Sequence, residues 1–320
     1  MKRVAIIGTG KLGVRIAEEL IRNESCDKLF LWNRSKRRLQ GALLSLQIYG
    51  SIVQSGTQID QLHWKSVDDC DLVVLVVKDD YDPRDLLQNE SFPDWFPVDV
   101  RTVGFRRDAP LVRDVCSMLR NYTGTVVVLT NPLDVMTTFV HQWLPSAQVV
   151  GLGVSLDAAR LAYMLSKSNV PISGRDECPV GGEHGKNIVL LKSLWNGKVA
   201  QNKPSQAILR KALKNAAGLG PKIVQGLGYT LHDCAAIFSQ DITTLLHLQR
   251  PSSSKFLCLS IVDSEAAIGR PVICHRNAQR FSIYSDILDE ELKAITAAKN
   301  GIAQLVDQIR RSKRFHDMVN

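Results

Sequence analysis

The stretch Val4–Gly13, VAIIGTGKLG, decides the fold of this chain. Its short apolar run predicts a buried strand, the Gly-x-Gly-x-x-Gly pattern that follows predicts a turn, and the next residues repeat at helical spacing. A tight turn, a close approach of backbone to pyrophosphate and close helix–sheet packing each require a glycine, so this order predicts a dinucleotide-binding corner. Its candidate residues are Gly8, Gly10, Lys11, Leu12 and Gly13, and the predicted inner face of the helix comprises Ile16, Ala17, Leu20 and Ile21.

The residue after the second predicted strand bears on the choice of cofactor. Asn33 follows the strand predicted over Leu29–Trp32, about 20 residues past the last glycine, where an acidic residue usually binds the ribose hydroxyls. An acid there would repel a 2′-phosphate, whereas Asn33 followed by the guanidinium of Arg34 and the hydroxyl of Ser35 would accept it. We therefore expect NAD(P) as cofactor, with NADP(H) preferred over NAD(H). The alternative interpretation is a solvated, basic start of a helix.

Further strands and helices extend this corner into a Rossmann-type α/β fold, a doubly wound parallel sheet. Continuous apolar runs, as a sheet covered on both faces requires, predict strands over Asp71–Val77 and Thr125–Leu129. Helices are expected over Leu39–Ile48 and from about Ala109 to Leu119, and an edge strand over Ser51–Gln54. Between the strand predicted over Asp71–Val77 and the helix predicted from Ala109 lies a segment without clear periodicity, Lys78–Val103, which is typical of a lid or a binding loop.

A carboxylate, a guanidinium and an imidazole lie close together in the sequence between Gly151 and Gly185. Asp157 and Arg160 stand three residues apart, and with Ser155 as N-cap they would share one face of a helix. His184 follows between glycines that permit a sharp turn. An Arg can hold a carboxylate through two parallel hydrogen bonds, and a His oriented by an Asp can move a proton. The alternative is a surface salt bridge with an unrelated loop histidine.

The second half of the chain predicts its own core, so two domains are expected: residues 1–148, binding dinucleotide, and residues 149–320, a mixed α+β substrate domain. Its predicted elements are a strand and turn over Lys192–Lys198, a helix opening at Leu209, helices over Leu231–Leu248 and Leu288–Ile309, and antiparallel strands over Phe256–Val262 and Val272–Ile273. The faces expected to point inward are Ala235, Ile237 and Leu245 in one helix and Leu292, Ile295, Ile302, Leu305 and Ile309 in the last.

The composition of the chain favours some classes of protein and argues against others. The chain has 320 residues, a hydrophobic content of 45% and a charged content of 22%, which is ordinary for a globular protein. Its net charge of +8 suits anionic ligands, but no nucleic-acid motif accompanies it, and no apolar run could span a membrane. The seven cysteines form no Cys-x-x-Cys pair, and the histidines show no ligand spacing, so no metal site is expected. Reduced thiols indicate a cytoplasmic location.

Four motifs together resemble the L-lactate and malate dehydrogenase family, the NAD(P)-dependent L-2-hydroxyacid dehydrogenases. Besides the glycine turn, they are TNPLDVMT from Thr130, GLGVSLDAAR from Gly151, GGEHG from Gly181 and the segment Gly228-Tyr229-Thr230. The resemblance implies hydride transfer between a nicotinamide and a 2-oxo or L-2-hydroxy acid, by a homodimer or homotetramer. It implies that His184 is the acid/base, oriented by Asp157, that Arg160 holds the substrate carboxylate, that Asn131 contacts substrate and cofactor, and that Thr230 lines the pocket.

The chain departs from the family pattern at several places. The ribose-binding acid is absent, Lys186 stands where an Asp commonly follows GEHG, and the segment Gly269–Ala278 keeps only a faint likeness. The segment after Val77 lacks the family's arginine-bearing loop, and the candidates to replace that arginine are Arg84, Arg101 and Arg106. The length of this segment and its aromatic residues, Phe92, Trp95 and Phe96, favour a larger or branched 2-oxo acid. The alternative function is an inactive homologue that serves as a nucleotide-binding or regulatory protein.

Overall fold

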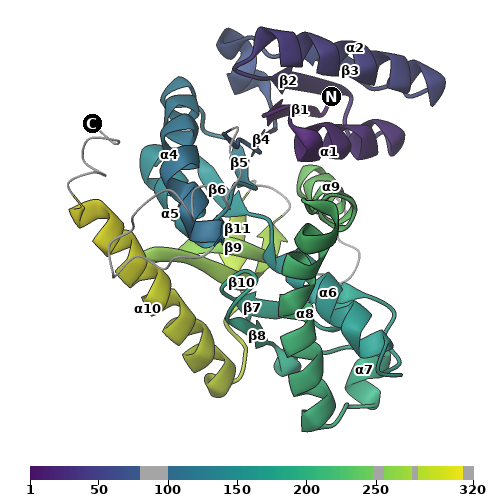
Figure 1. Cartoon of the computed structure of the whole chain (residues 1–320), viewed down its shortest axis with the longest axis vertical. Helices are drawn as coiled ribbons and strands as arrows, with labels where there is room; N and C mark the ends of the chain where they lie inside the picture. Colours follow the sequence, from purple (N-terminus) through teal and green to yellow (C-terminus); the bar gives the residue numbers. More distant parts are fainter. Residues whose placement is uncertain (80–99, 248–255, 276–279, 313–320) are drawn as a thin grey trace. The chain divides into compact units, whose positions relative to one another are not determined.

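The computed structural model describes residues 1–79, 100–247, 256–275 and 280–312 (Figure 1). These form two compact units, one of Met1–Gly151 with Val262–Ala267 and Gly301–Asn320, the other of Leu152–Ile261 with Ile268–Asn300. The ends of the strand β9 (Leu257–Asp263) and the helix α10 (Asp289–Arg311), and the start of the strand β10 (Ala266–His275), fall in the first unit. The boundary that the sequence suggests between residues 148 and 149 stays a prediction.

A parallel sheet of six strands forms the core of the first unit. Its order is β3-β2-β1-β4-β5-β6, and Val4 of β1 lies opposite Leu29 of β2 on one side and Leu72 of β4 on the other. The chain therefore fills one side of β1 first and then crosses to the other, which creates a switch point between β1 and β4, where ligands bind in such sheets. The predicted doubly wound fold is confirmed. The strands are β1 (Arg3–Ile7), β2 (Lys28–Trp32), β3 (Gln58–Gln61), β4 (Leu72–Leu75), β5 (Thr125–Val128) and β6 (Gln148–Gly151).

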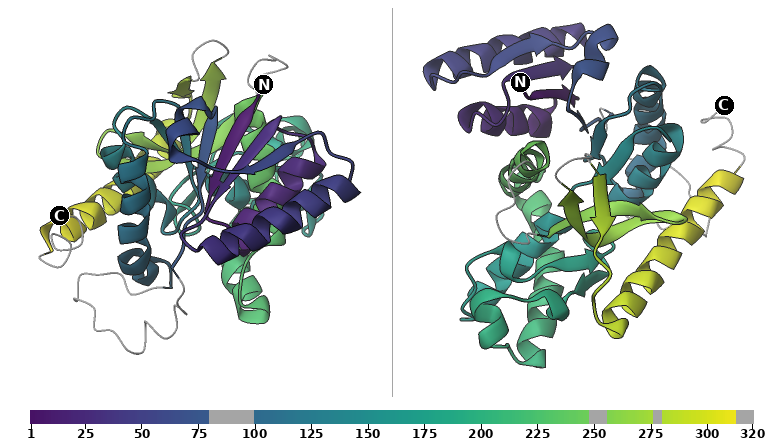
Figure 2. Two further views of the ribbon diagram at one scale, coloured as in Figure 1. Left: turned by 90° about the horizontal axis from the view of Figure 1, so that it is seen from above. Right: turned by 180° about the vertical axis from the view of Figure 1, so that it is seen from behind.

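Helices cover the apolar strands of this sheet. The helix α1 (Lys11–Arg22) buries the inner face predicted from its spacing, Ile16, Ala17, Leu20 and Ile21, and it packs beside the helix α2 (Lys36–Ile52), as the view from above in Figure 2 shows. The described part of Met1–Gly151 also contains the helical elements η1 (Trp64–Asp69), α4 (Val100–Met118) and α5 (Leu133–Trp143).

Two boundaries in the first unit differ from the sequence-based expectation. The edge strand predicted over Ser51–Gln54 is wrong, because α2 continues to Ile52 and the edge strand is β3. Gly50 directly precedes this run and is typical of a helix end, but here it is buried inside α2, and the helix continues past it. The helix α4 begins at Val100 rather than near Ala109, so the end of the segment predicted to be irregular is helical. The rest of that segment, residues 80–99, with Arg84 and the three aromatic residues, lies outside the described residues.

The second unit combines helices with an antiparallel sheet. The helix α6 (Val154–Ser166) packs against α8 (Gln206–Leu227) and α9 (His232–Leu246), and all three are visible in Figure 1. In the sheet, β7 (Val180–Gly182) pairs with β8 (Ile188–Leu190) and with β10, and β10 pairs with β11 (Arg280–Ile283); β9 is the other neighbour of β10. The predicted antiparallel sheet is confirmed.

Two further predictions for the second unit are wrong. Lys192–Lys198 is not a strand and turn, because it contains the 3₁₀ turn η3 (Lys192–Leu194) and the start of the short helix α7 (Gly197–Gln201); the strand precedes it as β8. Leu292, expected on the inner face of α10, is 37% exposed, whereas Ile295, Ile302 and Ile309 are buried. The unit also contains the 3₁₀ turn η2 (Arg175–Glu177), which precedes β7.

In the described part of the chain, no helix is long and apolar enough to cross a membrane, and no His, Cys, Asp and Glu side chains cluster as metal ligands.

Candidate functional site

The glycine turn after β1 has the shape that a dinucleotide phosphate requires. Gly8 has a φ of +115°, and a Cβ there would lie 2.5 Å from the carbonyl oxygen of Val76 at the end of β4. A Cβ on Gly13 would lie 2.0 Å from the carbonyl oxygen of Gly8, so only glycine lets α1 start so close to the turn. A Cβ on Gly10 would meet no atom within 4 Å, so its side of the turn is open to a ligand. Phosphate oxygens at this place would face the N-terminus of α1, where Lys11 and Leu12 begin the helix.

The side chains at the ribose position form a small hydrogen-bonded turn. The Asn33 amide donates to Thr9 Oγ1 at 2.9 Å, and its carbonyl oxygen accepts from the backbone N–H of Ser35 at 2.8 Å. The hydroxyl of Ser35 caps α2 by accepting from the N–H of Arg38 at 3.3 Å. Arg34 is exposed and pairs with Asp79 at 3.3 Å. Position 33 carries no carboxylate. The next residue, Arg34, nevertheless has the carboxylate of Asp79 beside its guanidinium.

Asn131 lies just past the carboxyl end of β5. Thr130 before it is buried and donates its hydroxyl to the carbonyl oxygen of Val77 at 2.8 Å, which ties the end of β5 to the segment after β4. Asn131 itself is exposed, and α5 begins two residues later with Pro132 as its N-cap. It therefore occupies the sheet edge at which ligands bind in open α/β folds, as the sequence predicts.

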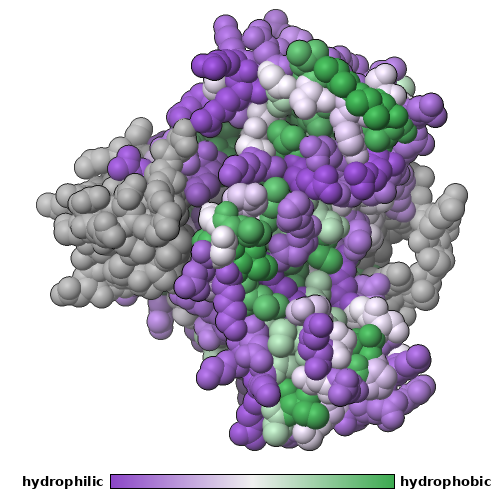
Figure 3. Space-filling model, turned by 45° about the vertical axis from the view of Figure 1, so that its right-hand side comes forward, coloured by the Kyte–Doolittle hydropathy of each residue, from purple (hydrophilic) through white to green (hydrophobic). Residues whose placement is uncertain are grey.

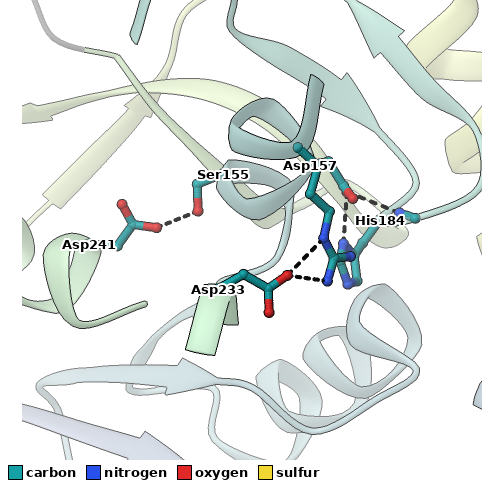
Figure 4. A network of polar contacts seen from close by, with 7 residues as sticks. Ser155, Asp157, His184, Asp233 and Asp241 are labelled. Carbon is teal, nitrogen blue, oxygen red and sulfur yellow. Dashed lines mark hydrogen bonds and ion pairs between the residues drawn. The ribbon is translucent and has the colours of Figure 1, made fainter. Parts of the chain in front are cut away.

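Asp157 and His184 meet in the second unit. Nδ1 of His184 lies 2.8 Å from Oδ2 of Asp157, and the same oxygen accepts the backbone N–H of Gly185 at 3.0 Å (Figure 4). Because a carboxylate only accepts hydrogen bonds, Nδ1 carries the proton in this contact, so proton exchange with a ligand would take place at Nε2. The Asp157 side chain is 2% exposed and that of His184 is 10% exposed, so the pair is shielded from water.

The loop between β7 and β8 holds His184 in this position. The strands pair from Val180 opposite Leu190 to Gly182 opposite Ile188, and the five residues between them form the loop. Gly182 and Gly185 have φ values of +86° and +75°, a left-handed conformation that glycine adopts without steric cost. The expectation that these glycines allow a sharp turn around the histidine is confirmed.

Arg160 is buried on α6, and a carboxylate already binds it. Its Nε and Nη2 donate to Oδ2 of Asp233 at 3.1 and 2.7 Å. Asp233 lies in the first turn of α9, and Figure 4 shows its carboxylate directed at the guanidinium. On α8, a Cβ at Gly220 would lie 3.1 Å from Nη1 of Arg160, so this glycine makes room for the guanidinium. Arg160 is thus neither a surface residue nor an unoccupied anion site.

Thr230 belongs to the same region of the second unit. It stands in the short connection between α8 and α9, and its side chain hydrogen-bonds to the thiol of Cys234. Burial raises the pKa of Cys234 to about 11, which keeps the thiol protonated and argues against a nucleophilic role. Arg160 contacts Asp233 and Thr230 contacts Cys234, so both residues lie next to the first turn of α9.

A second polar contact connects α6 to α9. The hydroxyl of Ser155 donates to Asp241, which is fully buried and pairs with Arg175 at 2.7 Å. Ser155 is therefore not the N-cap of α6, as the sequence suggested; the cap position is Gly153, and Ser155 is the second residue of the helix. Burial raises the pKa of Asp241, and the Arg175 guanidinium opposes this shift. The contact fixes the N-terminal turn of α6, from which Asp157 projects.

Asp233 and Gly220 are the residues of this site that sequence reasoning missed. Asp233 lies only three residues past Thr230, but an acidic residue in the first turn of a helix is common because the helix dipole favours it there. Its partner lies on another helix, so the pattern of α9 alone could not reveal the contact. Gly220 precedes Pro221, a pair typical of a turn, yet it lies inside α8, and nothing in the pair indicates a contact with Arg160.

The whole chain resembles known dehydrogenases. It is 23% identical over 332 residues to an L-lactate dehydrogenase of Fervidobacterium nodosum, covering 98% of this chain and 100% of the relative. A lactate dehydrogenase from a Medee basin deep-sea metagenome library superposes with a TM-score of 0.81 at 19% identity, covering 97% of this chain and 99% of that one. A malate dehydrogenase of Archaeoglobus fulgidus in complex with NADH gives a TM-score of 0.77 at 15% identity, covering 96% and 99%.

No model of a protein family matches the sequence. The similarity to L-lactate dehydrogenases nevertheless extends over nearly the whole chain, and the solved structures share its fold. The resemblance inferred from the four motifs is confirmed.

Proposed function

We propose that this chain is a nicotinamide-dependent oxidoreductase that transfers a hydride between its cofactor and a 2-oxo acid or L-2-hydroxy acid. The observation that carries the proposal is the contact of Asp157 with His184, because a carboxylate at Nδ1 directs proton exchange to Nε2 and stabilises the imidazolium. The fold and the full-length similarity to L-lactate dehydrogenases support it.

Each residue of the site has a role in this reaction. The bound nicotinamide supplies or accepts the hydride. His184 gives its Nε2 proton to the substrate oxygen during reduction and takes it back during oxidation. Asp157 fixes the ring and stabilises its charged form, while Arg160 anchors the substrate carboxylate and Thr230 lines the pocket. Asn131 contacts substrate and cofactor.

The glycine turn of the first unit would hold the pyrophosphate through backbone N–H groups, because Gly8 and Gly13 permit the turn and Gly10 leaves it open. For the adenosine ribose, we propose that NADP(H) binds more tightly than NAD(H). Asn33 does not repel a 2′-phosphate, Ser35 has a hydroxyl proton to donate, and Arg34 would exchange Asp79 for the phosphate.

Measured dissociation constants for NADPH and NADH test this preference. In the variant Asn33→Asp with Arg34→Ala, the order of affinity should reverse, because a carboxylate accepts from the ribose 2′-hydroxyl and repels a phosphate. Tighter binding of NADH than of NADPH by the unaltered protein would show that the basic residues only solvate the start of α2.

The activity is tested with a panel of 2-oxo acids assayed with both reduced cofactors. We expect the highest kcat/KM for an acid with a side chain larger than methyl. Turnover in the unaltered protein and none in His184→Asn, with cofactor binding retained, is the expected pattern. Activity that survives in His184→Asn would remove this residue from the mechanism.

A second candidate function is an inactive homologue that binds the nucleotide and acts as a regulatory protein. The observation that favours it is the ion pair of Arg160 with Asp233, which occupies the guanidinium that should hold substrate. Tight dinucleotide binding without reduction of any 2-oxo acid in the panel would select this function.

We also propose that the protein is a homodimer or homotetramer located in the cytoplasm. The helix α2 exposes Leu44, Ile48 and Ile52 at intervals of four residues, and an apolar band runs along this part of the first unit in Figure 3. Exposed apolar bands of this kind are typical of subunit interfaces. The described cysteines are all free and buried, in keeping with a reducing compartment. Sedimentation equilibrium tests the oligomeric state.

A further inference from the structure

Asp233 places a carboxylate on the donor edge of Arg160, the edge that a substrate carboxylate needs. We propose that Asp233 is an internal competitor for the substrate carboxylate, and that the need to displace it lowers the affinity of the site for every 2-oxo acid. This inference rests on the proposed function of the site. It assigns a role in substrate affinity to a residue outside the motifs that the chain shares with dehydrogenases.

The geometry of the pair matches that of a bound ligand. Nε and Nη2 of a guanidinium point in nearly the same direction, and together they form one of its two-point donor edges. Both donate to the same carboxylate oxygen of Asp233, at 3.1 and 2.7 Å. Gly220 lies next to the remaining nitrogen, Nη1, where α8 covers the guanidinium. A substrate carboxylate that approaches Arg160 therefore competes with Asp233 for the same donors.

Burial and charge indicate which partner can leave. The Arg160 side chain is 8% exposed and therefore stays in place, whereas that of Asp233 is 32% exposed. Asp233 stands in the first turn of α9, so its carboxylate remains favoured there by the helix dipole after it turns away from Arg160. Displacement by an incoming carboxylate is therefore feasible, but it costs the protein an existing charge-assisted contact.

The consequence for affinity follows from the carboxylate that all 2-oxo acids have in common. All of them carry the carboxylate, so a weaker carboxylate anchor lowers the affinity for every member of the class. The cost of displacing Asp233 is the same for small and large acids, so the ratio of their affinities does not change. A small acid, which binds mainly through its carboxylate, is therefore the most direct probe of the competition.

The experiment measures the affinity of oxamate, an unreactive isostere of pyruvate, by calorimetry in the presence of saturating NADH or NADPH. The variant is Asp233→Asn, which keeps the shape of the side chain and removes its charge. The matched control is Asp289→Asn, which removes an exposed acidic residue from the first turn of α10. Cofactor affinity, measured separately, reports whether each variant is folded.

We expect the dissociation constant of oxamate to fall at least about tenfold in Asp233→Asn, because a charge-assisted competitor is lost, and to stay unchanged in Asp289→Asn. The KM for pyruvate should fall in parallel, with a smaller change in kcat. If Asp233→Asn does not fold, the same increase in affinity is expected of Asp233→Ser.

Two outcomes overturn the proposal, and they are distinguishable. If the unaltered protein binds oxamate and the variants bind it equally or more weakly, then Asp233 only stabilises the helices, and the proposed function stands. If neither the unaltered protein nor the variants bind oxamate while all bind the cofactor, then the site does not accept 2-oxo acids, and the proposed function fails with the inference.

Discussion

Replacing Gly220 with alanine tests whether the guanidinium of Arg160 must remain where the structure places it. Gly220 lies inside α8, and a Cβ there would be 3.1 Å from Nη1 of Arg160, 3.7 Å from Cζ and 3.8 Å from Nη2. The guanidinium cannot withdraw freely, because Nε and Nη2 are hydrogen-bonded to Asp233. The alanine should therefore push Arg160 away from its position by a few tenths of an ångström.

The magnitude follows from a comparison with Gly218 in the same helix. A Cβ on Gly218 meets no atom within 4 Å, so Gly218→Ala should raise the free energy of unfolding by the helix-propensity difference, about 1 kcal/mol. The same gain at Gly220 is opposed by the disturbed contact of Arg160 with Asp233, since a hydrogen bond to a charged group contributes about 1.5–3 kcal/mol. We expect Gly220→Ala to be no more stable than the unaltered protein.

Two measurements are needed, because Pro221 also restricts the residue before it and contributes to the stability of Gly220→Ala. Urea unfolding gives the stability of both variants, and steady-state kinetics with the best 2-oxo acid of the panel reports on Arg160 itself. A shift that costs about 1.4 kcal/mol of substrate binding lowers kcat/KM about tenfold. Gly218→Ala should leave kcat/KM unchanged. Equal kcat/KM in the two variants would refute the role of Arg160 as carboxylate anchor.

Three further predictions concern separate parts of the chain. Gly8→Ala should abolish dinucleotide binding, measured by NADH and NADPH fluorescence, because the residue has a φ of +115° and its Cβ would clash with Val76; retained affinity would contradict the assignment of the turn. His184→Asn should reduce kcat to background without changing cofactor affinity, since it removes the proton donor but no part of the first unit. Burial lowers the pKa of His141 from its ordinary value of 6.5, so the residue stabilises the fold above that pH and this contribution is lost as pH falls through the lowered pKa. Urea unfolding of His141→Gln between about pH 7.5 and 5 should therefore show a weaker pH dependence than the unaltered protein, and an equal dependence would exclude the effect.

The first unit was predictable in detail because its signals are local. Each buried strand is a continuous apolar run, and the positive φ of Gly8 needs a residue type that the sequence displays directly. The failures also have local causes. The run Ser51–Gln54 resembles a short strand because Gly50, a residue type typical of helix ends, directly precedes it, whereas α2 continues through this glycine to Ile52.

In the second unit, the sequence identified the residue types of the site but not all of their partners. Asp157 and His184 could be expected to meet, because a motif resemblance covers both. The partner of Arg160 could not be expected, since Asp233 reaches it only through the packing of α9 against α6. The same packing explains Ser155, whose hydroxyl binds Asp241 on α9 instead of capping its own helix. A side chain whose partner lies on another helix shows no periodic pattern or turn motif in the sequence that would reveal the contact.

The charges of the site show why such a partner matters for function. With a neutral His184, Asp157 and Arg160 together carry no net charge, and the inclusion of Asp233 brings the sum to −1, from −1 + 1 − 1. In the proposed reaction, reduction begins with the protonated His184, which returns the sum to zero before an anionic 2-oxo acid binds. Oxidation begins with the neutral ring, so an anionic 2-hydroxy acid would enter a site that is already negative. The difference between the two acids comes from the proton on His184, since without Asp233 the two sums would be +1 and 0. Asp233 lowers both sums by one unit, so it weakens the attraction of the site for either anionic acid, and this effect arises from a residue that the shared motifs do not contain.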